Sequence, residues 1–499
     1  MMSPMDKPLL HEPHGAHTLD HDSSMNAALF VGRLKHRVDA HRAIMQGYAR
    51  VAGRSALREQ SFVVSKLADS TFAAAEALVG PTTDPDLEAK AKDEDDASLQ
   101  TNGEAIVNLL NNCLGSGMLT MGFAMGNAGI LPAFFLMLLS AFLNRYTLLL
   151  NLSVCNRSGC DPGTAAIGEK AFGVTGRAIM IVLYTVFAFL CCVSYVDASS
   201  DAVEGLLELL LGKDISSTQV LLGCWLLLLL PTTLIRSLKS VALLSFVAFI
   251  GGCVMLAAVS VYCVLELMTT GLPALSELAW SPPSSTVFWS SFPILLLIFS
   301  IQAGGGVVLA TMKDTSEKNI RAVSGNSYIL VLGMDFTIGI VSYVTFRGDI
   351  QGNVLLNFSP DSIIAVVARL ALLVLVVLSY MIMMIPCKLS MIDLLYHKNE
   401  SRMEASTSEF YGVTLTLNVL ALCLALSVSD LSLVNGLNGA VCTNLVAFVL
   451  PIAFCLAIQR DVEGIPVFSC ANIKYFLILA FGCFSLVLGT NQIVQRFLT

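Results

Sequence analysis

The chain has 499 residues, of which 55% are hydrophobic and 13% charged, and its formal net charge is −8. A soluble protein carries about 25% charged residues, and the apolar runs of about 20 residues that recur along this chain are long enough to cross a bilayer. The composition therefore excludes a soluble globular protein and predicts an all-α polytopic membrane protein.

Residues 1–100 differ in composition from the rest of the chain. They are predicted to form a largely disordered cytosolic N-terminal tail ahead of a transmembrane domain at 101–499. Carboxylates dominate 84–96, whereas 33–58 is strongly basic, with apolar residues at loosely helical spacing. An alternative for this basic stretch is an amphipathic helix on the anionic inner leaflet. A cytosolic protein is a candidate partner of the tail.

Hydropathy predicts about eleven membrane spans after the tail. They lie near 105–125, 130–152, 178–200, 218–235, 240–262, 288–310, 325–346, 362–386, 411–429, 433–458 and 473–495. Lys and Arg gather in alternate loops, which places the N-terminus in the cytosol and the short C-terminus on the opposite side. Six of the seven histidines precede residue 42, so we expect no histidine-ligated metal site in the membrane.

The first span contains a sequence that is unfavourable for a continuous helix. Two asparagines precede Gly115-Ser116-Gly117, and glycine both lowers helix propensity and frees the backbone to unwind. Unwound backbone at membrane depth is tolerated only where protein or water satisfies its polar groups, and such breaks mark the sites of secondary transporters. Exposed amides at the break suit a carboxylate. The substrate-binding candidates are Asn112, Leu114, Gly115, Ser116 and Gly117.

The sixth span carries a second interruption, at Gly304, Gly305 and Gly306. Spans 1 and 6 would begin two five-helix halves, and glycine breaks at corresponding positions of two halves point to a transporter site. Gln302, just before these glycines, is the further candidate for substrate binding. The alternative is that the glycines only allow helices to pack closely. Aromatic residues that could line the cavity or simply pack between helices are Tyr184, Tyr195 and Tyr380.

Asp335 lies near the middle of the seventh span, where an ionised carboxylate costs several kcal/mol. It is a candidate proton site or counter-charge for a cation. The alternatives are a carboxylate that faces a water-filled crevice or a buried partner of Arg369 or Arg145. Asp197 and Asp201, at the outer end of the third span, are expected in water.

The segment 108–130 resembles the first helix of the amino acid/auxin permease family, in particular its sodium-coupled neutral amino acid transporter branch. The matching positions are Asn108, Asn111, Gly115, Ser116, Gly117, Met118, Leu119, Ala124 and Gly129. Further segments resemble the family in the same order between residues 100 and 495, namely 167–177, 343–348, 353–358, 368–370, 386–388, 439–440 and 448–451.

The resemblance implies a LeuT-like fold, with two inverted five-helix repeats and an eleventh transmembrane helix. It implies a substrate bound between broken helices 1 and 6 and a cation bound between helices 1 and 8. By position, Asn111 matches the cation-site asparagine of the family, and Ser379 stands where the family has a threonine. Two departures are Gln302, where the branch often has a histidine, and glycines 304–306, which replace bulkier residues.

We expect a secondary active transporter of small neutral amino acids that works by alternating access around helices 1 and 6. Na⁺ or H⁺ is the expected coupling ion, with no other cofactor or metal, and the expected partners are the amino acid and the lipid bilayer but no nucleic acid. The alternatives are a transporter of cationic amino acids or auxin-like acids, and an amino-acid sensor that signals through the tail. An enzyme is not expected, because no set of nucleophile, base and acid is apparent. The membrane is the plasma membrane or a vacuolar or endolysosomal one, the latter because residues 6–10 resemble a dileucine sorting signal.

Overall fold

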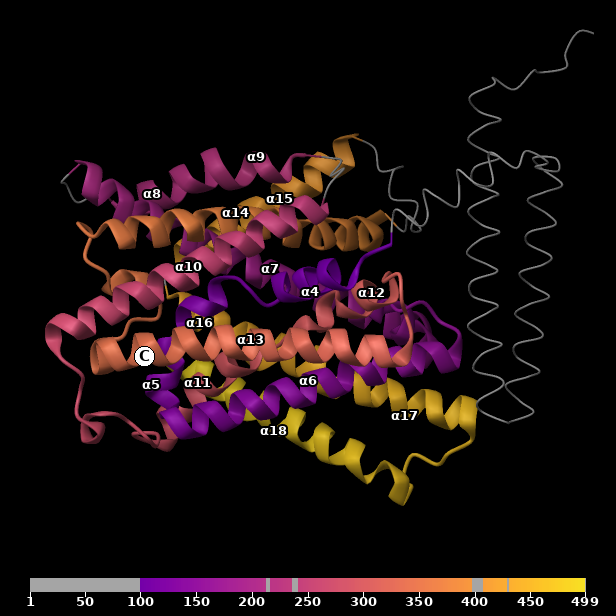
Figure 1. Cartoon of the computed structure of the whole chain (residues 1–499). Helices are drawn as coiled ribbons and strands as arrows, with labels where there is room; N and C mark the ends of the chain where they lie inside the picture. The colour runs from indigo at the N-terminus through magenta and orange to yellow at the C-terminus, as the bar shows by residue number, and fades with distance from the viewer. Residues whose placement is uncertain (1–98, 212–215, 236–240, 397–406, 429, 499) are drawn as a thin grey trace, which may run out of the picture. The chain divides into compact units, whose positions relative to one another are not determined.

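The computed structural model describes residues 99–211, 216–235, 241–396, 407–428 and 430–498. The predictions for the N-terminal tail, for its partner and for its sorting signal lie outside these residues. Residues 100–499 form one compact unit, and it consists of helices that run largely along one direction (Figure 1). The prediction of an all-α membrane protein is confirmed.

Each of the predicted spans coincides with a helix or with a group of short helices. In chain order these are α4 (Asn102–Asn111), η1 (Ser116–Thr120), α5 (Met121–Ala128), α6 (Ile130–Ser158), α7 (Thr164–Leu211), α8 (Ser217–Cys224), η2 (Trp225–Leu229), α9 (Leu230–Thr233), α10 (Val241–Thr270), η3 (Leu275–Glu277), α11 (Ser285–Leu297), η4 (Ile301–Ala303), α12 (Gly305–Ala310), α13 (Glu317–Phe346), η5 (Arg347–Asp349), η6 (Val354–Asn357), α14 (Ile363–Tyr396), α15 (Thr407–Ser427), α16 (Leu431–Leu437), η8 (Asn438–Val449), α17 (Leu450–Glu463), η9 (Cys470–Asn472) and α18 (Ile473–Leu498).

Within the described ranges, eight helices are long and apolar enough to cross a membrane. The remaining three predicted spans are made of shorter pieces: α4 to α5, α8 to α9, and α11 to α12. The count of eleven spans therefore stays a prediction. η2 and η8 are π-helical, a widened form that often occurs at functional sites.

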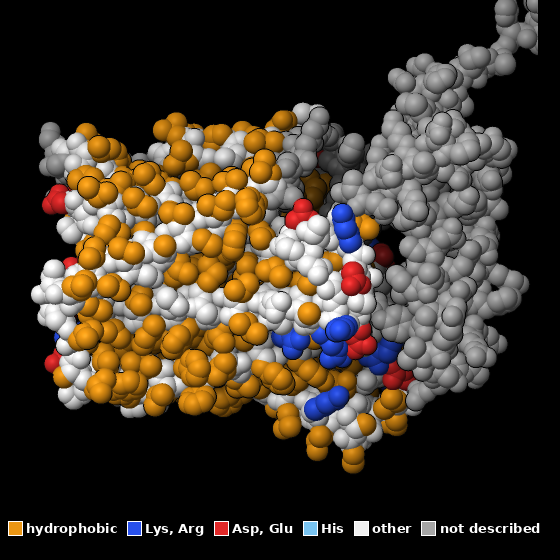
Figure 2. All heavy atoms as spheres, in the orientation of Figure 1, with side chains coloured by type: hydrophobic (Ala, Val, Ile, Leu, Met, Phe, Trp, Pro, Cys, Tyr) orange, Lys and Arg blue, Asp and Glu red, His pale blue; other side chains and the backbone are white. Residues whose placement is uncertain are grey.

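Apolar side chains cover the side of the bundle, as Figure 2 shows for one face. Phe135 and Phe142 on α6 and Ile329 on α13 are each more than 60% exposed, which suits a surface in contact with lipid tails. Lys and Arg gather at one end of this face (Figure 2). Inside the bundle, α14 packs against α7 and α10, while α18 packs on η8.

Candidate functional site

The first predicted break is present in the structure. α4 begins with a capping box formed by Thr101 and Glu104 and ends at Asn111. Four residues without regular helix follow before η1 begins at Ser116. Gly115 is fully extended, with φ 179° and ψ −152°. The amides at the start of η1 therefore have no preceding helical turn to bond to.

The second predicted break interrupts the sixth span. α11 ends at Leu297, and the short helix η4 separates it from α12, which begins at Gly305. Gly304, at the join, has φ −136° and ψ −8°. Regular helix is thus interrupted at residues 298–300, before η4, and at Gly304, after it.

The two breaks face each other. A Cβ built on Gly304 would lie 3.4 Å from Nδ2 of Asn112, and one built on Gly117 would lie 3.6 Å from Cγ2 of Ile298. The start of the first segment and the end of the sixth are tied as well, because the amide of Gln100 donates to the carbonyl of Thr311 at 2.9 Å. Helices 1 and 6 therefore place their irregular backbone side by side.

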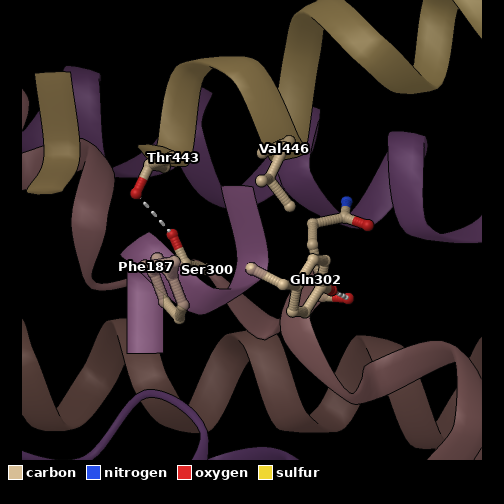
Figure 3. A pocket seen from close by; sticks show the side chains of 7 residues that line it. Phe187, Ser300, Gln302, Thr443 and Val446 are labelled. Atoms are coloured by element: carbon tan, nitrogen blue, oxygen red, sulfur yellow. Dashed lines mark hydrogen bonds between the residues drawn. The ribbon is translucent and has the colours of Figure 1, made fainter. Parts of the chain in front are cut away.

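A pocket lies beside the second break. It is lined by Tyr184, Phe187, Ser300, Gln302, Thr443, Val446 and Ala447, which come from α7, the helix 6 break and η8. Figure 3 shows the hydroxyls of Ser300 and Thr443 pointing toward each other, 2.9 Å apart. None of the seven lining side chains is acidic or basic. The pocket has room for about one water molecule, so an amino acid does not fit in this arrangement.

Gln302 is the predicted substrate residue that lines this pocket, but its side-chain amide is engaged elsewhere. Nε2 donates to the carbonyl of Asn144 at 2.9 Å and to Oγ1 of Thr147 at 2.7 Å, and Asn151 donates to its Oε1 at 3.5 Å. The backbone carbonyl of Gln302 accepts a hydrogen bond from the Tyr184 hydroxyl at 2.6 Å. Gln302 thus anchors the helix 6 break to α6 and α7.

Most of the pocket lining was not among the predicted site residues. Tyr184 was a candidate, whereas Phe187, Ser300 and the η8 residues were not. Ser300 could have been found, because it lies within the helix 6 break, two residues before Gln302. The sequence of 438–449 does not indicate that this segment forms π-helical turns or that it lines the pocket beside the helix 6 break.

The predicted cation ligands have different surroundings. Asn111 donates from Nδ2 to the carbonyl of Ser245 on α10, and its buried Oδ1 has no hydrogen-bond partner. Ser379 on α14 is 5% exposed and interacts with the Tyr195 hydroxyl. A Cβ built on Gly115 would lie 2.7 Å from that same hydroxyl. Tyr195 therefore stands between the first break and α14.

Asp335 is completely buried in α13, and neither carboxylate oxygen has a hydrogen-bond partner. The alternative that Asp335 pairs with Arg369 or Arg145 is wrong. Arg369 donates instead to the carbonyls of Gly205, Leu355 and Phe358, and Arg145 donates to the carbonyl of Arg321.

The expectation that Asp197 lies in water is also wrong. Its side chain is 5% exposed, and Oδ2 has no hydrogen-bond partner. Asp201, one turn further along α7, accepts a hydrogen bond from Asn353 at 2.7 Å. The loop before α14 thus covers this end of α7, which hydropathy along α7 alone does not reveal.

Comparison with known proteins gives a match between residues 99–495 and the family model described as "Transmembrane amino acid transporter protein". The Arabidopsis thaliana "Amino acid transporter AVT6C" is 23% identical, over 72% of this chain and 86% of that protein. The Arabidopsis thaliana "Amino acid transporter AVT1C" is 26% identical, over 79% of this chain and 69% of that protein. The Rattus norvegicus "Putative sodium-coupled neutral amino acid transporter 11" is 22% identical, over 76% of this chain and 83% of that protein.

Among solved structures, the fold is similar to that of Mhp1, a nucleobase-cation-symport-1 family transporter in a closed conformation with bromovinylhydantoin bound. The TM-score is 0.54 and the identity 14%, over 80% of this chain and 92% of that one. This likeness shows a LeuT-like fold.

Proposed function

The chain belongs to the transmembrane amino acid transporter family, and on that premise we propose that it is a secondary active transporter of small neutral amino acids coupled to Na⁺ or H⁺. It is a multi-pass membrane protein and a transporter rather than an enzyme. The observation that carries the proposal is the juxtaposition of the two helix breaks, where Gly304 faces Asn112.

The breaks offer main-chain groups to both ends of a zwitterion. Amides at the start of η1, near Ser116 and Gly117, suit the substrate carboxylate. Carbonyls released where α11 ends suit the substrate ammonium group. Neither role needs a charged side chain, which is consistent with a neutral substrate.

The lining of the pocket supports a small and uncharged substrate side chain. Ser300 and Thr443 supply hydroxyls, and Val446 and Ala447 supply apolar surface. A cationic substrate would need a nearby acid to offset the cost of burying its charge, and the seven lining residues include none. We therefore favour alanine-sized and similar neutral amino acids over lysine or arginine.

Two side-chain oxygen atoms support coupling to a metal cation such as Na⁺. Asn111 keeps a buried Oδ1 without a partner, and Ser379 offers a hydroxyl on α14. Oxygen atoms of this kind are the ligands that hard cations prefer. Asp335 supports coupling to protons instead, because burying a charge without a partner is costly and a bound proton removes that charge.

Transport further requires a change of conformation. The pocket has room for about one water molecule, so this arrangement is closed around it. Alternating access would open it to each side in turn, and a cation that binds one conformation more tightly would shift the population toward it.

Uptake by the purified full-length chain in proteoliposomes tests the proposal. Radiolabelled alanine is supplied with an inward Na⁺ gradient, with an inward proton gradient, and with each gradient dissipated by an ionophore. We expect saturable uptake that one gradient drives and that excess alanine or glutamine inhibits more strongly than lysine. Gradient-independent, non-saturating flux would reject coupled transport, and strong competition by lysine alone would favour the cationic alternative.

A further inference from the structure

The C-terminal end of α6 brings two cysteines together. The sequence there is Cys-Asn-Arg-Ser-Gly-Cys, from Cys155 to Cys160. Gly159 has φ 65°, and the amides of Gly159 and Cys160 both donate to the carbonyl of Cys155, the latter at 3.2 Å. A left-handed glycine therefore ends the helix, and the bond from Cys160 to Cys155 is the six-to-one bond typical of a Schellman motif, in which the side chains at the positions of Cys155 and Cys160 meet.

The surroundings of the two thiols differ in a way that suits a reactive pair. Cys155 is buried, and its Sγ donates to the carbonyl of Asp161 at 3.3 Å. Cys160 is partly exposed and accepts a hydrogen bond from Oγ of Ser158 at 3.2 Å. The contact with Cys155, helped by Ser158 and the positive charge of Lys170, lowers the pKa of the Cys160 thiol to about 7, although burial opposes this. An accessible thiol that readily ionises beside a second thiol is the arrangement of redox-sensing cysteines.

We propose that Cys155 and Cys160 form a reversible disulfide when a hydroperoxide reaches this loop, and that the disulfide slows transport. The Cys160 thiolate attacks an oxygen of hydrogen peroxide, so that an S–O bond forms and the O–O bond breaks. The leaving hydroxide takes up a proton, equivalent to the one released when the Cys160 thiol ionised, and departs as water. The sulfur of Cys155 then attacks the Cys160 sulfenic acid. An S–S bond forms, the S–O bond breaks, and a second water leaves with the Cys155 proton. Two thiols are thereby oxidised and one hydrogen peroxide is reduced.

The location of the pair supports a regulatory role. The basic residues of the sequence place this loop in the cytosol, where disulfides are transient and serve redox sensing. In this structure both cysteines are free thiols. Because the two residues already meet in the turn that ends α6, a bond between them would fix the loop in its present position.

Contacts of the same loop connect it to the moving parts of the proposed mechanism. A Cβ built on Gly306 in α12 would lie 2.8 Å from the carbonyl oxygen of Pro162, so the loop packs directly on the inner piece of helix 6. Arg157, inside the same motif, forms an ion pair with Glu463 at the end of α17. A loop fixed in this position would hold α12 and α17 in the closed arrangement.

The test uses the full-length chain in proteoliposomes, treated with hydrogen peroxide and then with an alkylating reagent, and mapped by mass spectrometry. We expect a cross-linked Cys155–Cys160 peptide, loss of most alanine uptake, and recovery of both after dithiothreitol. Cys155→Ser and Cys160→Ser should each keep their uptake after peroxide. Cys470→Ser is the matched control, because Cys470 is exposed and on the same predicted side, and it should respond like the wild-type chain.

Alkylation of both Cys155 and Cys160 after peroxide would overturn the disulfide. A disulfide that forms while uptake is unchanged would overturn its regulatory role. The same conclusion would follow if peroxide inhibited the two serine variants as strongly as the wild-type chain. The thiol map needs no transport activity, so it can fail independently of the proposed transport function.

Discussion

Asp335 is the buried acid of α13 whose two carboxylate oxygens lack partners. If it carries the coupling proton, Asp335→Asn keeps the size of the side chain but cannot lose or gain a proton near neutral pH. We expect uptake by this variant to lose its pH dependence between pH 5.5 and 8. The measurement is alanine uptake across that range, with Asp349→Asn, an exposed position in η5, as the control that keeps the wild-type profile. An unchanged profile for Asp335→Asn would remove the residue from proton coupling.

Ser379 tests the other coupling ion. On the proposal that the Ser379 hydroxyl binds Na⁺, Ser379→Ala should raise the Na⁺ concentration for half-maximal uptake by about tenfold, equivalent to roughly 1.4 kcal/mol. Ser390→Ala, on the same helix and partly exposed, should leave that concentration unchanged. If neither variant alters the Na⁺ dependence while Asp335→Asn abolishes the pH dependence, protons are the coupling ion.

Cys160 carries a prediction about pH. With its pKa lowered to about 7, the reactive thiolate is present above that pH and is lost as the pH falls below it. The rate at which iodoacetamide modifies Cys160 should therefore fall to about half of its plateau near pH 7. Cys155→Ser removes the main cause of the shift and should move the midpoint to higher pH. A midpoint that stays at the same pH in this variant would contradict the assignment.

The sequence identified single residues that are unusual for a membrane span, but it did not predict which other residues they contact. Asp335 was identifiable because an acid within an apolar span is costly, but whether an arginine reaches it depends on helices far away in the chain. Gln302 was assigned to the substrate, whereas its amide is bonded to α6. The available signal was the spacing of Asn144, Thr147 and Asn151, which puts three polar side chains on one face of a helix.

Among the elements, the approach of η8 to α11 depends on one glycine. A Cβ on Gly439 would overlap the carbonyl oxygen of Pro293, so Gly439→Ala must push the two helices apart, at a cost of about 1–3 kcal/mol. We expect a lower unfolding temperature for this variant in a thermal-shift assay of purified protein. Gly412→Ala is the matched control, because nothing lies within 4 Å of a Cβ at that helical position. Equal unfolding temperatures for the two variants would contradict the close approach.

The positions of the helices followed from hydropathy, and both breaks followed from glycine chemistry. The π-helical form of η8 could not be predicted from the sequence, because it depends on contacts with segments that are distant in the chain. Asn444 donates to the carbonyls of Gly439 and Ala440 at 3.1 and 2.8 Å, and Gly439 lies against Pro293. Phe172 and Gly173 leave helical geometry within α7; both precede the predicted span at 178–200, and hydropathy did not predict the helical segment that begins at Thr164.

For the whole molecule, the distribution of Lys and Arg makes a prediction about orientation. A membrane-impermeant maleimide should label Cys470 only after the membrane is permeabilised, because the positive-inside rule places it in the cytosol. An Asp349→Cys variant, at an exposed position that the same rule predicts to lie outside, should be labelled in intact cells. Peptide mapping identifies the labelled site, and the reverse pattern would invert the topology.

Tyr195 has a consequence for how this protein can vary. Its ring fills the space that any side chain at position 115 would need, while its hydroxyl interacts with Ser379. Homologues that gain a methyl group at 115 should therefore have lost atoms at 195, so that the two positions covary. The same covariation should extend to 379, because a phenylalanine at 195 leaves the serine without its tyrosine partner.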